Sequence, residues 1–406
     1  MADGQLTAAP VRAESARIAL RVGLIYFAAR LVTTGFLLLA TALAGPGSRI
    51  GANASLADIV LAWDGQWYWL IAVSGYPTTL PLTDDGGVAE NAWAFLPIFP
   101  TLARWVSLPF GHWAAGAAIV SLIAGYAASV VLFHLLRRKL DETASTWAVV
   151  FFACGPLAAL FHVAYAETLN LLWLFCALWC VLSRRYGWLY ALVPLMAFTR
   201  PGVLAFSLFL ALFGIWRWFT RDREPLRTPE IVHIVVLGLL AAITGFAWQF
   251  IADAVTGSNG AYLSTELAWR RNWLPGGDAV FLPFEGFLSA TGLYADMWGI
   301  PPWLAYTALV ACVAGCAAAL IFVPQVKALG VELRLWSASY LAYLLLVFFP
   351  QSSTLRLLVP LSPLWGAVAV PRLTAWRVIL LAGCLAGQWW WIHLVYALGD
   401  TAWRVP

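Results

Sequence analysis

The sequence predicts an all-α protein that crosses a membrane many times, and three observations lead to this fold class. Of its 406 residues, 62% are hydrophobic and only 11% are charged. A soluble domain carries about 25% charged residues, so this chain cannot build a water-facing surface of ordinary size. Apolar stretches of about 20 residues, long enough to cross a bilayer as helices, recur between Ile18 and Ala397. Basic clusters lie between them, as in the short loops of multi-spanning membrane proteins.

The apolar stretches predict about eleven membrane-spanning helices of roughly 15–25 residues. The stretch 188–217 counts as two short spans, because Thr199-Arg200-Pro201-Gly202 interrupts it and proline and glycine break helices. The first stretch is too long for the apolar part of a cleaved signal peptide, which has about 7–15 residues, so we expect it to be retained. The whole chain, 1–406, is expected to be one transmembrane domain with no soluble domain before or after it. The stretches are 18–44, 113–136, 146–163, 169–182, 188–217, 231–255, 303–323, 335–349, 355–370 and 378–398.

The basic clusters predict the orientation. Cytoplasmic loops of membrane proteins carry an excess of Lys and Arg, so we place the N-terminus, with Arg12, Arg17 and Arg21, in the cytoplasm. Five later clusters then fall on the same side, provided that 95–110 lies along the membrane surface and does not cross. We therefore expect an integral, multi-pass membrane protein, in the plasma membrane if the source is bacterial. The clusters lie at 137–139, 184–185, 217–227, 327–334 and 372–377.

Two long segments, 45–113 and 256–302, remain on the outside, and long ordered loops tend to carry function. The first contains Asp64 at the start of an aromatic-rich helix suited to the lipid–water boundary. We expect this helix to align Trp63, Trp67, Leu70, Ile71 and Ser74 along one side. Asp64 either caps the helix or is a catalytic base presented at headgroup depth.

Arg200 and Arg356 lie at the outer ends of predicted spans, where the orientation rule does not require basic residues. A guanidinium group binds phosphate through two parallel hydrogen bonds and stays charged in a low-dielectric site. Both arginines either bind a phosphate or reach out to the lipid headgroups. We expect Arg270 and Arg271 to contact headgroups or solvent, with phosphate or acceptor binding as the alternative.

Several other polar residues are candidates on the same side. Asp84 and Asp85 precede two glycines and predict a solvated turn. Glu90 is either a functional acid or a surface residue. Glu167 needs a cavity or a partner, because a carboxylate next to lipid is costly. His162 is more typical of packing or loop hydrogen bonding than of a ligand. Arg30, inside the first span, needs a partner that the sequence does not identify.

Other classes of function lack support. The six cysteines lie in apolar stretches without zinc-site spacing, so we expect no disulfide framework and no metal. The basic residues form short loop clusters, which argues against nucleic-acid binding. No glycine-rich nucleotide-binding motif is present, so we expect no nucleotide sugar and no cofactor.

The motifs of the first outside segment resemble those of the PIG-V-type mannosyltransferases. The similarity is carried by a Trp-Asp pair, Ile-Ala, Gly-Tyr, a glutamate and a Phe-x-Pro run with a second proline. Tyr165-Ala166-Glu167 is similar to the family's Tyr-Ser-Glu, with alanine in place of serine, and Thr199-Arg200-Pro201 is similar to its Thr-Arg-Pro. The motif residues here are Trp63-Asp64-Gly65-Gln66-Trp67-Tyr68, Ile71-Ala72, Gly75-Tyr76, Glu90 and Ala94-Phe95-Leu96-Pro97-Ile98-Phe99-Pro100.

The resemblance implies a GT-C glycosyltransferase-like fold with interfacial helices in the first outside loop. It also implies a polyprenyl-phosphate-mannose donor, inversion at the anomeric carbon and no metal. The acceptor, a lipid or a glycan, does not follow from it. Asp64 is the expected catalytic residue. Donor binding is expected from Trp63, Tyr68, Glu90, His162, Glu167, Arg200 and Arg356.

The alternative function is a lipid or glycolipid flippase or transporter. Such a protein needs polar residues along several spans, and the span centres here are apolar apart from Arg30 and a few Ser, Thr and Gln. The chain also shows no pair of matching halves, which many transporters have. A purely structural membrane scaffold would leave the two long aromatic segments unexplained.

Overall fold

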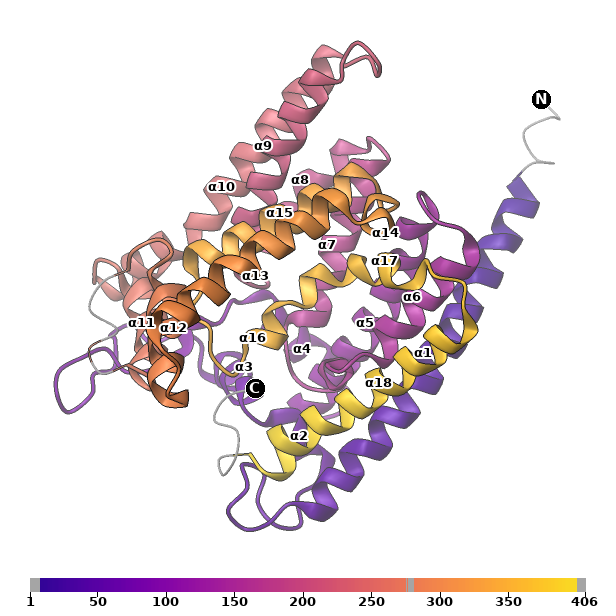
Figure 1. Cartoon of the computed structure of the whole chain (residues 1–406). Coiled ribbons are helices and arrows are strands. Elements are labelled where there is room, and N and C mark those ends of the chain that lie inside the picture. The colour runs from indigo at the N-terminus through magenta and orange to yellow at the C-terminus, as the bar shows by residue number, and fades with distance from the viewer. Residues whose placement is uncertain (1–7, 275, 277–280, 400–406) are drawn as a thin grey trace.

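The computed structural model describes residues 8–274, 276 and 281–399, and within them the protein is built from helices (Figure 1). These residues include no strand, only an isolated bridge between Leu82 and Val88. Five of the described helices are long and apolar enough to cross a membrane. The predicted all-α, multi-spanning architecture is therefore confirmed, and the chain is an integral membrane protein. The five are α1 (Ala8–Leu43), α5 (Trp113–Arg137), α10 (Thr228–Thr256), α13 (Pro302–Phe322) and α18 (Thr374–Ile392), the last continued by η5 (His393–Ala397).

The remaining predicted spans are also helical, but two of them are interrupted. The stretch 146–163 is α6 (Glu142–Cys154), which ends where Gly155 and Pro156 follow, and then η2 (Ala158–Phe161). The stretch 355–370 is divided into α16 (Thr354–Leu357), η4 (Val359–Leu364) and α17 (Trp365–Ala369). Pro360 and Pro363 cause this division, because proline lacks the N–H that continues an α-helix. The intact shorter helices are α7 (Glu167–Leu182), α8 (Leu189–Ala197) with η3 (Tyr186–Trp188), α9 (Val203–Phe219) and α15 (Gly330–Val347), which α14 (Pro324–Lys327) precedes.

The largest core cluster lies among α5, α6, α7, α9, α15 and α17. Small residues in α5 let neighbouring helices approach closely, as in other membrane bundles. Gly116 is the clearest case, since an added Cβ would lie 2.4 Å from the carbonyl oxygen of Ala103. The expected break in 188–217 is confirmed: α8 ends at Ala197, and α9 begins after Gly202, whose φ of 132° favours glycine.

In their described residues, the two long connections contribute six short helices. The first holds α2 (Leu56–Leu61), α3 (Asp64–Ser74), η1 (Ala92–Ala94) and α4 (Ile98–Ser107), and the second holds α11 (Ala261–Arg271) and α12 (Glu285–Trp298). With ten residues, α4 is about 15 Å long and cannot cross a hydrocarbon core of about 30 Å. This length fits the expectation that 95–110 does not cross, which stays a prediction. The buried residues of α3 are Gly65, Tyr68, Ile71 and Ala72. Of the side chains predicted to lie along one side, Trp63 and Ile71 are buried, whereas Leu70 and Ser74 are exposed.

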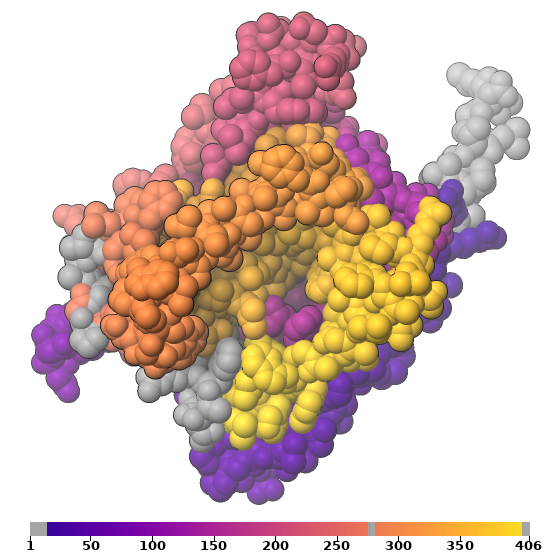
Figure 2. Space-filling model, viewed as in Figure 1, coloured from indigo at the N-terminus to yellow at the C-terminus, as the bar shows by residue number. Residues whose placement is uncertain are grey.

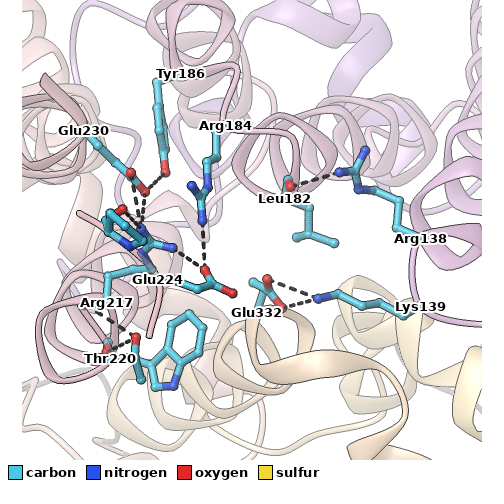
Figure 3. Close-up of polar contacts among 12 residues, drawn as sticks. Arg138, Lys139, Leu182, Arg184, Tyr186, Arg217, Thr220, Glu224, Glu230 and Glu332 are labelled. Carbon is cyan, nitrogen blue, oxygen red and sulfur yellow. Dashed lines mark hydrogen bonds and ion pairs between the residues drawn. The ribbon is translucent and has the colours of Figure 1, made fainter. Parts of the chain in front are cut away.

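Residues of four of the basic clusters lie close together (Figure 3). Ion pairs and a hydrogen bond from Arg138 to the carbonyl oxygen of Leu182 (3.3 Å) connect residues within and between these clusters. This agrees with the single side that the positive-inside pattern predicted. The pairs are Lys139–Glu332 (3.1 Å), Arg184–Glu224 (2.8 Å), Arg217–Glu224 (2.6 Å), Arg217–Glu230 (3.3 Å) and Arg372–Asp141 (3.1 Å).

Candidate functional site

Asp64 lies in the first turn of α3, and its position is fixed by two neighbours. Trp63, the N-cap residue, has a φ of 55° and makes no side-chain cap hydrogen bond. Gly65 packs against the preceding segment so closely that an added Cβ would lie 2.6 Å from the carbonyl oxygen of Val60. Asp64 itself is not the N-cap residue, and its carboxylate is used elsewhere. The capping interpretation is therefore wrong.

The carboxylate of Asp64 belongs to a chain of four alternating charges. Its Oδ2 accepts a hydrogen bond of 2.5 Å from Nη1 of Arg356. Nε of Arg356 lies 3.3 Å from Oε1 of Glu167, and the same oxygen lies 2.5 Å from Nη1 of Arg200. The negative charges of two carboxylates balance the positive charges of two guanidinium groups, so the group is neutral as a whole. A buried group of this kind is stable only when every charge has a partner.

The four charges come from four separate segments. Glu167 is the first residue of α7, and Arg200 lies in the turn between α8 and α9. Arg356 lies in α16, the short helix that the broken stretch 355–370 makes possible. Glu167 is the most deeply buried, with 3% of its side chain exposed, whereas 14% of Asp64 and 11% of Arg200 are exposed. Asp64 and Arg200 are thus the members that a ligand can reach most readily.

A cavity of about 360 Å³ adjoins the charge chain at Glu167. Its lining is apolar except for three residues, Glu167, Thr168 and Ser362. The apolar lining comes from two stretches, 152–171 and 355–368. Figure 2 shows the molecule hollowed on one face between α13 and α18, and the colours in this hollow include those of both stretches. The charge chain therefore has an apolar chamber on one side.

Glu266 lies close enough to Arg200 and Asp64 to be influenced by their charges, and the sequence analysis missed it. It lies on α11 of the second long connection, and its carboxyl group forms a side-chain hydrogen bond with Tyr262. Loss of hydration raises the pKa of Glu266 to about 7, and the nearby charges of Arg200 and Asp64 act on it in opposite directions. The spacing of Tyr262 and Glu266, four residues apart in an outside segment, is the sequence signal that could have found it.

Glu90 lies in the contact between the two long connections. Its Oε1 accepts a hydrogen bond of 2.6 Å from Nδ2 of Asn272, and loss of hydration raises its pKa. Arg271 donates to the carbonyl oxygen of Val88 (2.9 Å) in the same contact. Glu90 is therefore half-buried at a junction of loops, and among the described residues no hydrogen bond or ion pair joins it to Asp64.

The two aromatic candidates have different surroundings. Tyr68 is buried against Phe95 and Phe99, and its pKa is raised by burial and by the nearby charge of Glu167. Its ring therefore forms part of the wall around the charge chain. Trp63 is buried too, and its indole N–H donates to the carbonyl oxygen of Val395 (3.1 Å).

His162 lies apart from the charge chain, in contact with the first span. Its Nδ1 is 3.3 Å from Nη1 of Arg30, and its Nε2 is 3.0 Å from the hydroxyl of Thr34. Arg30 also donates to the carbonyl oxygens of Ala158 (2.6 Å) and Ala153. These contacts identify the partners that Arg30 needs inside a membrane span.

The structure corrects the expectation for Arg270 and Arg271. Arg270 is 5% exposed and pairs with Glu285 of α12. Arg271 binds the first long connection, as described above. Both arginines therefore connect loop segments, and the expectation of solvent contact is wrong for the buried Arg270, whereas Arg271 is half-exposed. The expectation for Asp84 and Asp85 is confirmed, since both are exposed in a turn closed by Thr83 and Gly87.

The described residues offer no group of side chains that could bind a metal ion at the charge chain. Within 8–274, 276 and 281–399, no three His, Cys, Asp or Glu side chains gather so that they could hold a metal ion. The acids of the charge chain bind guanidinium groups instead.

Comparison with known proteins finds similarity among solved structures. No family model matches the sequence, and no curated protein matches it. Three similar structures are of the oligosaccharyltransferase of Archaeoglobus fulgidus. The complex with Zn and sulfate has a TM-score of 0.46 and 15% identity, covering 92% of this chain and 53% of that chain. The complex of the enzyme, AglB, with an inhibitory peptide and a dolichol-phosphate has a TM-score of 0.44 and 12% identity, covering 93% of this chain and 56% of that chain. The structure tethered to an acceptor peptide has a TM-score of 0.39 and 11% identity, covering 94% of this chain and 56% of that chain.

The chain thus spans about half the length of the structures that it matches.

Proposed function

We propose that the protein is a GT-C-type glycosyltransferase that moves a hexose from a polyprenyl-phosphate donor to an acceptor hydroxyl. The observation that carries this proposal is the position of the charge chain. Asp64 and two arginines meet beside a chamber that is almost entirely apolar. A lipid-phosphate sugar needs the same combination, because its tail requires an apolar chamber and its phosphate requires cations.

In this proposal Asp64 is the general base. It takes the proton of the acceptor hydroxyl, whose oxygen attacks the anomeric carbon of the donor. The new C–O bond forms as the bond from the anomeric carbon to the phosphate oxygen breaks, and the lipid phosphate leaves with the electron pair. A single displacement of this kind inverts the anomeric carbon.

Arg356 and Arg200 have two tasks in this reaction. Each guanidinium group has five N–H donors, and the contacts to Asp64 and Glu167 use only some of them. The remaining donors bind the phosphate and stabilise the second negative charge that it acquires on leaving. Binding of the phosphate by Arg356 also competes with Asp64, which frees a carboxylate oxygen for the acceptor hydroxyl. Glu167, deeply buried between the arginines, keeps both in place.

The identity of the sugar and the side of the membrane are proposed on separate grounds. Mannose as the sugar rests on the resemblance to PIG-V-type enzymes. The extracytoplasmic position of the site, with a cytoplasmic N-terminus, rests on the basic clusters at the opposite end of the bundle. The acceptor is a lipid or a glycan.

The test compares Asp64→Asn with Asp84→Asn, which changes an exposed aspartate of the same long connection. Membranes from cells lacking the chain receive each full-length variant and labelled polyprenyl-phosphate mannose, and the label transferred to membrane acceptors is counted. We expect Asp64→Asn to lower transfer by about 10²–10⁴-fold, because a positioned base contributes that much, and Asp84→Asn to leave it unchanged. Full transfer by Asp64→Asn, together with lipid movement that depends on the protein, would instead support the transporter.

A further inference from the structure

A second cavity, of about 540 Å³, lies where the basic clusters at 184–185 and 217–227 meet. Figure 3 shows three residues of its lining, Arg184, Tyr186 and Glu230, beside Arg217 and Glu224. The lining comes from η3, from the start of α10 and from the residues just before each of them, namely Arg184, Tyr186, Pro225, Arg227, Pro229, Glu230 and His233. The charge chain around Asp64 contributes no residue to this lining, so the cavity is a separate site.

The surroundings of this cavity carry an excess of positive charge. Arg227 is exposed, and within the described part of the chain it makes no ion pair. Arg184 pairs with Glu224 at 2.8 Å and keeps most of its N–H donors for another acceptor. The two clusters and Glu230 carry six arginines and three carboxylates, namely Arg184, Arg185, Arg217, Arg221, Arg223 and Arg227 with Asp222, Glu224 and Glu230. An anion is therefore the ligand that the cavity favours.

Glu230, the carboxylate of the lining, repels an anion only weakly. It is buried, its Oε1 accepts a hydrogen bond from the hydroxyl of Tyr186 (3.0 Å), and Arg217 lies 3.3 Å from it. Because Arg217 does not line the cavity, it offsets this negative charge and leaves Arg184 and Arg227 available to a ligand.

Two further features of the lining suit an anion. It includes the N-cap residue and the first turn of α10, and Arg227 at the N-cap makes no side-chain cap hydrogen bond. The positive end of the dipole of this long helix therefore adds to the attraction. His233 stacks on Tyr186, with ring centres 5.7 Å apart, and its Nδ1 lies 3.0 Å from the hydroxyl of Tyr190, so Nε2 remains for a ligand.

The neighbouring surface indicates that the cavity lies at a boundary between lipid and water. Trp188 of η3 and Trp218 of α9 are exposed on either side in the chain, and tryptophan prefers that layer. The membrane-spanning α10 begins at the cavity, and its Val236, one turn beyond His233, is exposed. A molecule bound here therefore has polar groups around one end and an apolar helix surface along the other.

We propose that this cavity binds the phosphate of an anionic phospholipid. Arg184 and Arg227 donate to the phosphate oxygens, and the acyl chains lie against Val236 and the apolar surface of α10 that continues from it. A basic pocket between helices at the membrane surface is suited to such a headgroup. The bound lipid connects the turn at η3 to the start of α10 and so stabilises the folded chain. This site is separate from sugar transfer and does not depend on it.

The test measures lipid binding to the full chain, purified in a nonionic detergent, by native mass spectrometry. The probes are dioleoylphosphatidylglycerol, dioleoylphosphatidylcholine and inorganic phosphate. We expect one molecule of phosphatidylglycerol to bind more tightly than phosphatidylcholine and to raise the unfolding temperature, and inorganic phosphate at equal concentration to leave it bound. Arg227→Gln should weaken this binding by about fivefold, as expected for one arginine at an anionic headgroup.

The matched control is Arg223→Gln, which removes the same charge from the same connection outside the lining and should leave the affinity unchanged. Arg184→Gln is a second lining variant and should weaken binding as Arg227→Gln does, while Glu224 keeps its pair with Arg217 (2.6 Å). The unfolding temperature without added lipid shows that each variant is folded.

Three results would overturn the inference. Equal affinity for the two lipids, or equal losses in Arg227→Gln and Arg223→Gln, would show that diffuse surface charge attracts the lipid. Displacement of phosphatidylglycerol by inorganic phosphate at equal concentration would assign the cavity to a soluble phosphate compound. The outcome for Asp64→Asn bears on sugar transfer alone.

Discussion

Arg356 and Asp64 are 292 positions apart in the chain, yet their side chains form an ion pair of 2.5 Å. The pair joins the first long connection to α16, near the other end of the sequence. Arg356 also lies 5.1 Å from the centre of the Tyr165 ring and 3.3 Å from Glu167, so one guanidinium group holds three segments together.

Replacing Arg356 should affect both folding and transfer. Arg356→Ala leaves Asp64 without its partner and Glu167 with one arginine, and removing one partner of a buried pair costs about 3–5 kcal/mol. We expect a lower unfolding temperature and loss of transfer. Arg356→Lys keeps the charge but not the planar guanidinium group. We therefore expect its unfolding temperature to stay closer to the wild-type value than its rate of sugar transfer does. Thermal unfolding in detergent and the membrane assay measure the two effects, and Arg372→Ala, at an exposed pair on the opposite end, is the control. Full transfer by Arg356→Lys would show that the fork is not needed.

Gly65→Ala should displace Asp64. The new methyl group would lie 2.6 Å from the carbonyl oxygen of Val60, a backbone atom that cannot move without shifting the turn before α3. We expect a destabilisation of about 1–3 kcal/mol and a fall in kcat, since a small misplacement of a base is costly. Gly187→Ala, where an added Cβ meets nothing within 4 Å, should leave both quantities unchanged. Equal behaviour of the two variants would contradict the close contact at Gly65.

Filling the apolar cavity should weaken binding of long-chain donors selectively. Val368→Trp places a large ring in the chamber next to the charge chain. We expect the KM for a long-chain polyprenyl-phosphate sugar to rise, with a smaller change for a short-chain analogue that needs less of the chamber. Val378→Trp adds the same ring to an exposed position on α18 and is the matched control. A similar rise for both chain lengths would mean that the tail lies elsewhere.

The contact between the long connections can be tested through Thr265. Thr265→Val removes the hydroxyl that accepts from the buried amide of Asn91, and a buried donor without an acceptor costs about 1–3 kcal/mol. We expect faster proteolysis of the second connection and a lower unfolding temperature. Thr307→Val, on the exposed surface of α13, serves for comparison because its hydroxyl bonds only its own helix. Unchanged proteolysis would show that other contacts hold the loops together.

Much of the helical arrangement could be predicted from the sequence, because a bilayer imposes a simple rule on length and polarity. The broken segments were harder. Thr199 to Gly202 contains both proline and glycine within a few residues and was recognised as a break. Pro360 and Pro363 lie in an equally apolar stretch. Its hydrophobicity predicts one continuous span, whereas α16 and α17 are separate helices.

The site was partly predictable for a different reason. Asp64, Glu167, Arg200 and Arg356 stood out because charge at the end of an apolar span needs an explanation. Which charges would meet could not be predicted, since their pairing depends on how four segments pack. Glu266 was overlooked because a glutamate in a polar helix is ordinary in sequence, and only the docking of α11 brings it within the influence of Arg200. His162 shows the opposite case, where a plausible ligand proved to be the neighbour of Arg30.

Trp63 connects the first long connection to the end of the described chain. Its backbone has a φ of 55°, a conformation that costs about 1–3 kcal/mol and persists only when the surroundings enforce it. The enforcing contacts are the bond from its indole to Val395 and the bond from the Arg49 amide to the carbonyl of Gly399 (3.0 Å). The turn of π-helix at η5 therefore works as a clamp on the residue before Asp64. Deleting the chain from His393 onward would relax that clamp and inactivate the protein without touching any group that meets a substrate.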